Sequence, residues 1–202
     1  MALKFVLAPD SFKGSATASE IAEAMEIGIR RIFTEAEILQ VPMADGGEGS
    51  TEAIVDSTDG EFIYQTVQGP LNDKVEARIG LHGDGETAVI EMATASGLEL
   101  ISKEERNPYK TTTYGTGELI AYCLDQDLKK IILCIGGSAT NDGGVGMAQA
   151  LGYKFEDKDG NEIQRGGIHL KDIVKIDKSN VHPKLMNFEI LIASDVDNPL
   201  TG

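Results

Sequence analysis

One loop of this chain combines glycines with hydroxyl, amide and carboxylate side chains, and it covers residues 136–144. Its sequence is Gly-Gly-Ser-Ala-Thr-Asn-Asp-Gly-Gly, and it lies between an apolar run and a helical pattern. Glycines let backbone N–H groups approach phosphate oxygens, and the N-terminus of a following helix favours an anion. A tight turn alone would need fewer glycines. We therefore predict that phosphate is bound here by Gly136, Gly137, Ser138, Thr140, Asn141 and Asp142.

Apolar runs lead directly into three other polar loops, at residues 8–14, 42–49 and 193–198. Lys13 can meet a phosphoryl group or a substrate carboxylate as a point charge, although a solvated loop lysine is the simpler alternative. Carboxylates that converge at strand ends hold Mg²⁺ or accept a proton from an alcohol, whereas a single carboxylate often only caps a helix. These loops add the candidate residues Asp10, Ser11, Gly14, Asp45, Gly46, Gly47, Asp195 and Asp197.

Several other chemistries lack their motifs in this sequence. The chain has neither Gly-x-x-x-x-Gly-Lys-Ser/Thr nor a Gly-x-Gly-x-x-Gly spacing followed by the acid of a dinucleotide site. It has no Gly-x-Ser-x-Gly elbow, so serine-hydrolase chemistry has no support. His82, His169 and His182 show no mutual metal-binding spacing, and we interpret them as surface residues.

The candidate loops need a sheet that brings strand ends together, and the hydrophobic pattern predicts one. Apolar runs predict strands at residues 3–8, 37–41, 130–135 and 188–193, and the first has the pattern of a strand buried on both faces. Helical spacing predicts helices at residues 18–32, 50–56, 117–124 and 143–151. Alternation and turn residues predict strands at 61–67, 74–81 and 87–91 and a hairpin over 153–163. In open α/β sheets, ligands bind at the edge where parallel strands end.

Composition bounds the class of protein. The 202 residues allow one large domain or two small ones, and we place a change of domain near residue 60, where the pattern becomes more antiparallel. Lys and Arg number 18 against 33 Asp and Glu, so the net charge of −15 disfavours binding to nucleic acid or to an anionic membrane. Cys123 and Cys134 form no CxxC motif, which indicates reduced core thiols and a cytoplasmic protein.

Six blocks of the sequence closely resemble the motifs of class I bacterial glycerate kinases, and they occur in the family's order. Examples are Ala-Pro-Asp-Ser-Phe-Lys-Gly-Ser at residues 8–15 and Pro-Met-Ala-Asp-Gly-Gly-Glu-Gly at residues 42–49. The others lie at residues 91–98, 114–119, 136–144 and 195–200. The resemblance implies an ATP-dependent kinase that converts D-glycerate into 2-phosphoglycerate or 3-phosphoglycerate.

The same resemblance implies two α/β domains with the active cleft between them, one flavodoxin-like and one with a mixed sheet. Residues 1–60 would begin the flavodoxin-like domain, and residues 61–202 would form the mixed-sheet domain. Within the cleft we expect Asp10, Lys13 and Asp195 to be catalytic, with Asp195 as the base near the glycerate hydroxyl. We expect Asp45 or Asp197 to help hold Mg²⁺, and the glycine-rich loops to bind substrate and phosphate.

Family members continue past the Asp-Asn-Pro-Leu block at residues 197–200. We therefore expect the rest of the first domain beyond residue 202, and part of the nucleotide site to be absent from these residues alone. Two alternatives to a glycerate kinase remain open: a non-catalytic module that binds small anions, and a kinase for another small hydroxy acid. An exposed edge strand in the antiparallel part would also allow a homodimer.

Overall fold

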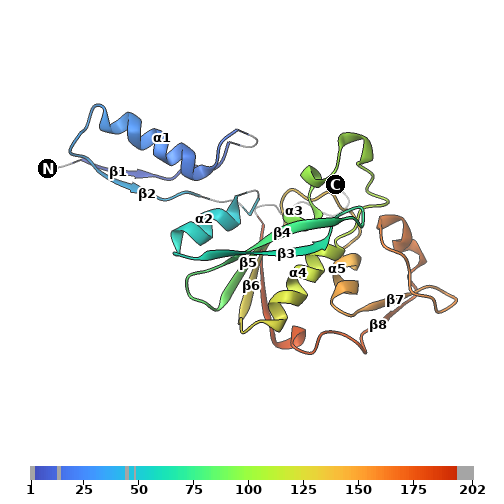
Figure 1. The fold of residues 1–202 in the computed structure, drawn as a ribbon. Coiled ribbons are helices and arrows are strands. Elements are labelled where there is room, and N and C mark those ends of the chain that lie inside the picture. The colour runs from blue at the N-terminus through green and yellow to red at the C-terminus, as the bar shows by residue number, and fades with distance from the viewer. Residues whose placement is uncertain (1–2, 13–14, 44–45, 48, 195–202) are drawn as a thin grey trace.

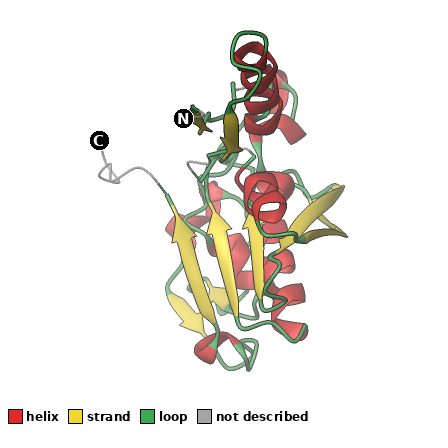
Figure 2. Cartoon of the chain, turned by 90° about the vertical axis from the view of Figure 1, so that its left-hand side faces the viewer, coloured by secondary structure: helices red, strands yellow, loops and turns green. Residues whose placement is uncertain are grey.

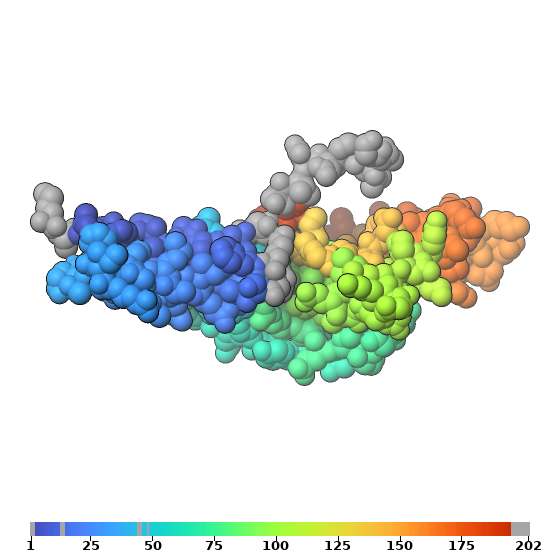
Figure 3. Space-filling view, turned by 90° about the horizontal axis from the view of Figure 1, so that it is seen from above, coloured from blue at the N-terminus to red at the C-terminus, as the bar shows by residue number. Residues whose placement is uncertain are grey.

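The computed structural model describes residues 3–12, 15–43, 46–47 and 49–194. Within these residues the chain is a mixed α/β protein whose larger sheet contains both parallel and antiparallel neighbours, which confirms the predicted class. Figure 1 shows an N-terminal unit of β1, α1 and β2 beside a larger body that contains this sheet. The two parts also lie next to each other in the space-filling view (Figure 3).

The N-terminal unit is a strand–helix–strand crossover. Its elements are β1 (Lys4–Leu7), α1 (Ala18–Arg30) and β2 (Glu37–Gln40), and β1 pairs in parallel with β2. Thr17 caps α1, because its side chain accepts a hydrogen bond from the Glu20 amide while the Glu20 carboxylate accepts one from the Thr17 amide. The capping box therefore fixes the point where the preceding loop becomes helix.

The expectation that residues 3–8 are buried on both faces is wrong. Val6 is 58% exposed, and its partner across the pair, Leu39, is 48% exposed. Only Leu7 of β1 is buried. Among the described residues β1 pairs with β2 alone, and Val6 and Leu39 of this two-stranded sheet remain exposed.

The larger sheet has the order β3-β4-β5-β6-β9 within the described residues. Antiparallel pairs join β3 to β4 and β4 to β5, whereas β5, β6 and β9 run parallel. Figure 2 shows neighbouring strands with their arrowheads pointing the same way, toward the N-terminal unit. The bounds are β3 (Glu61–Gln68), β4 (Lys74–Leu81), β5 (Thr87–Glu91), β6 (Lys130–Cys134) and β9 (Glu189–Ala193).

Helix α2 (Ser50–Ser57) packs on one face of this sheet, directly over Gly80 of β4. A Cβ at Gly80 would lie 2.5 Å from Cγ2 of Thr51 and 2.6 Å from Cγ2 of Val55. The preceding residue of the strand, Ile79, points to the opposite face and is fully buried there. The glycine therefore lets α2 lie close enough to the strand to exclude water.

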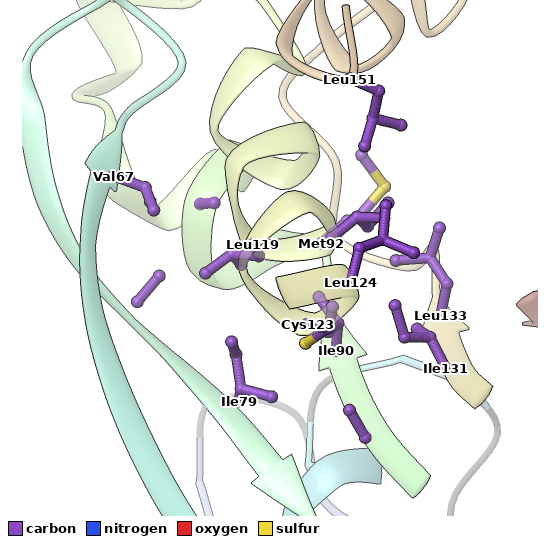
Figure 4. Close-up of a cluster of buried hydrophobic side chains, with 14 residues drawn as sticks. Val67, Ile79, Ile90, Met92, Leu119, Cys123, Leu124, Ile131, Leu133 and Leu151 are labelled. Atoms are coloured by element: carbon purple, nitrogen blue, oxygen red, sulfur yellow. The ribbon is translucent and has the colours of Figure 1, made fainter. Parts of the chain in front are cut away.

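The main core fills the opposite face, beneath α3 (Ala93–Ser96), α4 (Tyr114–Asp125) and α5 (Val145–Ala150). Figure 4 shows Ile79, Ile90 and Ile131 of the sheet meeting Leu119 and other side chains of α4. Cys123 belongs to this cluster, and burial raises the pKa of its thiol to about 12. The thiol is therefore protonated and unreactive at neutral pH.

The remaining elements form a smaller unit beside α4 and α5. β7 (Lys154–Glu156) pairs antiparallel with β8 (Lys175–Asp177). β7 is also the first arm of the predicted hairpin over 153–163, whose second arm pairs with it through an isolated antiparallel bridge between Glu156 and Glu162 and a hydrogen bond from the Ile163 amide to the Phe155 carbonyl. The guanidinium of Arg165 lies 3.3 Å from the ring centroid of Tyr114 and donates to Gln68, which ties this unit to α4 and β3. The described residues also contain 3₁₀ helices at Leu98–Leu100, Lys103–Glu105, Gly167–Asp172 and Leu185–Asn187.

The described helices are all too short or too polar to cross a membrane.

Candidate functional site

The carboxyl ends of β5, β6 and β9 meet the loop that precedes α2. The Gly136 amide, just after β6, donates a hydrogen bond to the Gly46 carbonyl at 3.3 Å. A Cβ at Gly136 would lie 2.7 Å from Cα of Gly47, and one at Gly46 would lie 2.8 Å from the carbonyl oxygen of Ala193 at the end of β9. Three loops that the sequence places far apart therefore touch through backbone at one edge of the sheet.

Ser50 holds the Gly46–Gly47 segment against the start of α2. Its hydroxyl accepts a hydrogen bond from the Gly46 amide at 3.1 Å and donates one to the Gly47 carbonyl at 2.8 Å. Gly46 has a φ of +88° and Gly49 a φ of +87°, values that disfavour any residue with a side chain. Gly46 is therefore required both by its backbone conformation and by its close approach to Ala193, whereas Gly49 is required by its conformation alone.

The segment after β6 is held on both sides by hydrogen bonds from its backbone. The Gly137 carbonyl accepts from the Leu98 amide at 3.0 Å, and the Ala139 amide donates to the Ser96 carbonyl at 2.9 Å. The hydroxyl groups of Ser138 and Thr140 are 2.8 Å apart. The loop is therefore fixed before any ligand arrives, which suits a site built from backbone dipoles.

Asp142, at the end of this loop, is buried and turns its carboxylate into the protein. Its oxygens accept hydrogen bonds from the amides of Thr113 at 2.8 Å, Gly144 at 3.0 Å and Gly146 at 3.1 Å. The Thr113 hydroxyl lies 3.0 Å from both oxygens and also accepts from the Met147 amide at 2.9 Å. Asp142 therefore joins the starts of α4 and α5 and sets the position of the loop.

A second feature lies beyond the Gly46–Gly49 segment, where the loop after β1 faces α2 and β4. Here a cavity of about 270 Å³ is lined by the loop after β1, the first turn of α1, Met43, the start of α2 and Arg78 of β4. Ser11 is one of its lining residues, and Asp10 next to it is exposed and accepts a hydrogen bond from the Ser11 amide. The Met43 amide donates to the Pro9 carbonyl at 2.9 Å, which keeps this loop beside the one that leads to Gly46.

A buried carboxylate, Glu91, ends β5 close to these loops. It accepts a hydrogen bond from the Thr51 amide in the first turn of α2 at 2.7 Å, and only 5% of the residue is exposed. A negative charge at the N-terminus of a helix is favourable, so Glu91 anchors α2 to the sheet edge. Glu91 lies in the block at residues 91–98 that resembles the family, but its residue type and position in the sequence did not predict a site residue.

The structure brings together part of the predicted site. Gly46, Gly47, Gly136 and Gly137 lie at one sheet edge with Ser138 and Thr140, and Ser11 lies at the neighbouring cavity. Asn141 is exposed, and its carbonyl lies toward Gly167. Lys13, Gly14, Asp45, Asp195 and Asp197 lie outside the described residues, and the described residues contain no cluster of three or more His, Cys, Asp or Glu that could hold a metal ion.

Arg78 is the cavity residue that sequence reasoning missed. The alternation of β4 indicated one solvent-facing side, and Arg78 fits that pattern as an ordinary surface residue. Only the position of α2 shows that its side chain ends at a cavity wall.

Comparison with known proteins gives a consistent result. The model of the glycerate kinase family matches residues 5–202. Glycerate kinase from Haemophilus influenzae is 54% identical over 200 residues, which are 99% of this chain and 53% of that protein. Glycerate 2-kinase from Escherichia coli is 53% identical over 200 residues, which are 99% of this chain and 52% of that protein.

A solved structure agrees with these matches. The crystal structure of putative glycerate kinase 2 from Salmonella typhimurium LT2 superposes with a TM-score of 0.89 at 51% identity, covering 100% of this chain and 54% of that one. The chain thus spans about half the length of the curated relatives it matches. With the family pattern running through residues 5–202 and these relatives covering nearly every position, the chain belongs to the glycerate kinase family.

Proposed function

We propose that this protein transfers the γ-phosphoryl group of ATP to D-glycerate and forms 2-phosphoglycerate, with 3-phosphoglycerate as the alternative product. The observation that carries the proposal is the contact of the Gly136–Gly137 segment with Gly46 and Gly47 at the carboxyl edge of the sheet. Phosphoryl transfer depends mainly on positioning and on stabilising negative charge. Backbone amides at a preformed edge supply both, even in a chain with a net charge of −15.

In this proposal the loop after β6 receives the ATP phosphates. Gly137 and Ser138 offer amides there, and Ser138 and Thr140 offer hydroxyls. Gly136, whose amide donates to the Gly46 carbonyl, holds the start of the loop in place, and Asn141 extends the same loop. Asp142 was predicted from the sequence to bind phosphate, but in this proposal it has a different role. Because its carboxylate is occupied by amides of the chain, it supports phosphate binding by positioning the loop.

The charged groups of the reaction belong to the loops at Asp10, Lys13, Asp45, Asp195 and Asp197. We assign Lys13 to the phosphoryl or glycerate oxygens, Asp10 to the same catalytic group, and Asp195 to accepting the proton of the glycerate hydroxyl. Asp45 and Asp197 would hold Mg²⁺ through their carboxylate oxygens. The metal supplies charge neutralisation for the phosphates of ATP when it is bound.

We further propose the two-domain division, with β1, α1 and β2 as the beginning of a flavodoxin-like domain that residues beyond 202 complete. The mixed sheet with its helices forms the second domain. The contacts of α2 with Gly80 and Glu91 favour a boundary ahead of Ser50 instead of at residue 60. The cleft between the two domains would then contain both the glycine-rich edge and the cavity.

The location and assembly of the protein complete the proposal. Cys123 and Cys134 are both buried, which supports a cytoplasmic protein with core cysteines, and the net charge argues against nucleic-acid or membrane partners. β3 is an edge strand of the described sheet and is available for pairing in a homodimer. Light scattering after size-exclusion chromatography tests the dimer, because a monomer at all concentrations would exclude it.

The experiment is a steady-state assay of the full-length protein with ATP, Mg²⁺ and a panel of D-glycerate, glycolate and tartronate. We expect the highest kcat/KM with D-glycerate, and we expect Lys13→Ala and Asp195→Asn each to remove most of the rate. A higher kcat/KM for another hydroxy acid would show that this acid, and not D-glycerate, is the preferred substrate, and the protein would still be a kinase. Binding of D-glycerate without turnover would support the anion-binding module instead.

A further inference from the structure

The cavity between the loop after β1 and α2 contains one arginine, Arg78, at its wall. Its volume of about 270 Å³ suits a compound of a few carbon atoms and is small for a nucleotide. Hydroxyl groups of Ser11, Ser15 and Ser19 line the side formed by the loop and α1. Glu20 and Glu52 also line the cavity. A cation beside hydroxyl-bearing residues is the chemistry that recognises a small hydroxy acid, provided that the two carboxylates leave the cation available.

The guanidinium of Arg78 keeps its hydrogen-bonding capacity within the described part of the chain. It forms an ion pair with Glu52 at 3.7 Å, which is beyond hydrogen-bond distance, and both side chains are about one-third exposed, at 30% and 35%. Its carbon Cζ lies over the Phe62 ring, 5.0 Å from the ring centroid, and this cation–π contact restrains the side chain. No hydrogen bond from this guanidinium to a described residue is present.

The two carboxylates that line the cavity, Glu20 and Glu52, differ in the hydrogen bonds that they accept. The Glu20 carboxylate accepts hydrogen bonds from the amide and hydroxyl of Thr17 in the capping box of α1. The Glu52 carboxylate lies 3.7 Å from the Arg78 guanidinium, too far for a hydrogen bond, so the N–H donors of Arg78 are not engaged by Glu52. A bound carboxylate would take the bidentate geometry that Arg offers and Lys does not.

The position of the cavity relative to the glycine-rich edge gives it a role. Gly49 lines the cavity, while Gly46 and Gly47 of the same short loop contact Gly136. One loop therefore separates the cavity from the segment assigned to the ATP phosphates. An acceptor held in the cavity would present its hydroxyl group toward that segment.

We propose that Arg78 binds the carboxylate of the acceptor substrate in this cavity and thereby selects a small hydroxy acid. The proposal rests on the phosphotransferase function proposed above. It adds a substrate-binding residue and places donor and acceptor on opposite sides of the loop at residues 46–49.

The test compares Arg78→Met and Arg78→Lys with wild type in the full-length protein. Loss of a charged, bidentate contact predicts a rise of about 100-fold in the KM for D-glycerate for Arg78→Met, with an unchanged KM for ATP. Arg78→Lys keeps the positive charge but cannot donate two parallel hydrogen bonds to a carboxylate, so we expect a KM for D-glycerate between those of wild type and Arg78→Met. D-Glyceramide, which lacks the negative charge, should be turned over equally by wild type and Arg78→Met.

Arg30→Met is the matched control, because Arg30 also pairs with a glutamate, Glu26 at 2.6 Å, but lies at the far end of α1. We expect its KM for D-glycerate to equal that of wild type. Thermal unfolding followed by circular dichroism shows whether Arg78→Met is folded. If it is not, the KM for D-glycerate of Arg78→Lys is compared with that of wild type instead. An unchanged KM for D-glycerate in a folded Arg78→Met or Arg78→Lys protein would overturn the proposal.

Failure of the proposed function is a separate outcome. If wild type does not phosphorylate D-glycerate, calorimetric titration with D-glycerate tests the cavity directly. Binding to wild type that is lost in Arg78→Met would support the cavity as a carboxylate site without the reaction. Equal binding to both proteins, or binding to neither, would overturn the role of Arg78.

Discussion

Gly136 and Gly47 lie in direct backbone contact, at the point where the loop after β6 meets the loop before α2. A Cβ at Gly136 would be 2.7 Å from Cα of Gly47, a separation that side-chain atoms do not tolerate. Residues 89 positions apart in the sequence, 136 − 47, thus share one edge of the sheet. The contact joins the proposed phosphate loop to the short loop whose Gly49 lines the proposed acceptor cavity.

Gly136→Ala should therefore disturb catalysis more than folding. The added methyl group meets backbone, which must shift, and a displacement of reacting groups by about 1 Å can cost about 100-fold in rate. We expect a loss of about that size in kcat/KM of the full-length protein, measured by ADP release. Gly28→Ala is the control, because a Cβ there meets nothing within 4 Å inside α1. It should keep the activity and raise the free energy of unfolding by about 0.5–1 kcal/mol.

Asp142→Ala should destabilise the fold, because three amides and the Thr113 hydroxyl lose a buried acceptor. Unsatisfied buried donors predict a fall of about 3 kcal/mol in the free energy of unfolding, measured by urea denaturation. Asp159→Ala removes an exposed carboxylate in a turn and should change this free energy by less than about 0.5 kcal/mol. Equal stability of Asp142→Ala and wild type would show that the network does not hold α4 and α5 together.

Gly80→Ala should push α2 away from the sheet. The methyl group would overlap Cγ2 atoms of Thr51 and Val55, and overpacking of this kind costs about 1–3 kcal/mol. Val55→Ala makes room, so the double variant should lose less stability than the sum of the two single changes. Strict additivity in this double-mutant cycle would mean that the two residues do not compete for the same space.

Asp84 provides a pH-dependent contribution to stability. Hydrogen bonds from the Glu86 amide and from the Thr87 hydroxyl and amide hold the pKa of Asp84 at about 2. Since the folded value lies below the usual value of about 3.9, the carboxylate stabilises the fold above pH 4, and this contribution is lost as the pH falls toward 2. Asp84→Asn should lack this acid-dependent loss, and Thr87→Val should raise the midpoint in a carboxyl ¹³C NMR titration. A midpoint for Asp84 near 4 in wild type would contradict the hydrogen-bond account.

Much of the fold followed from local pattern. The alternation of Val75, Ala77 and Ile79 predicted β4 with its observed bounds, and the helical spacing over residues 18–32 predicted α1 from its observed first residue, Ala18. Helix α4 begins at Tyr114 instead of Gly117. The Tyr114 amide donates to the Thr112 hydroxyl, and Asp142, from another segment, accepts a hydrogen bond from the amide of the N-cap residue Thr113. The strand β8 was missed, since its three residues acquire strand geometry only through pairing with β7.

The site residues differ in the same way: some follow from local sequence, and others depend on tertiary contacts. Glycines with positive φ, such as Gly46 and Gly137, could be recognised from clustering, because the requirement is local. The inward turn of Asp142 and the cavity position of Arg78 depend on which helix packs on which face. Those contacts arise only in the tertiary structure, so residue type and spacing could not separate a ligand-binding carboxylate from one that holds the loop.

The most direct test of the account is ³¹P NMR of the full-length protein with ATP, Mg²⁺ and D-glycerate. We predict a phosphomonoester resonance of phosphoglycerate that grows in step with ADP and is absent without D-glycerate. ADP with inorganic phosphate alone, or no consumption of ATP at all, would contradict the central claim that this protein phosphorylates D-glycerate.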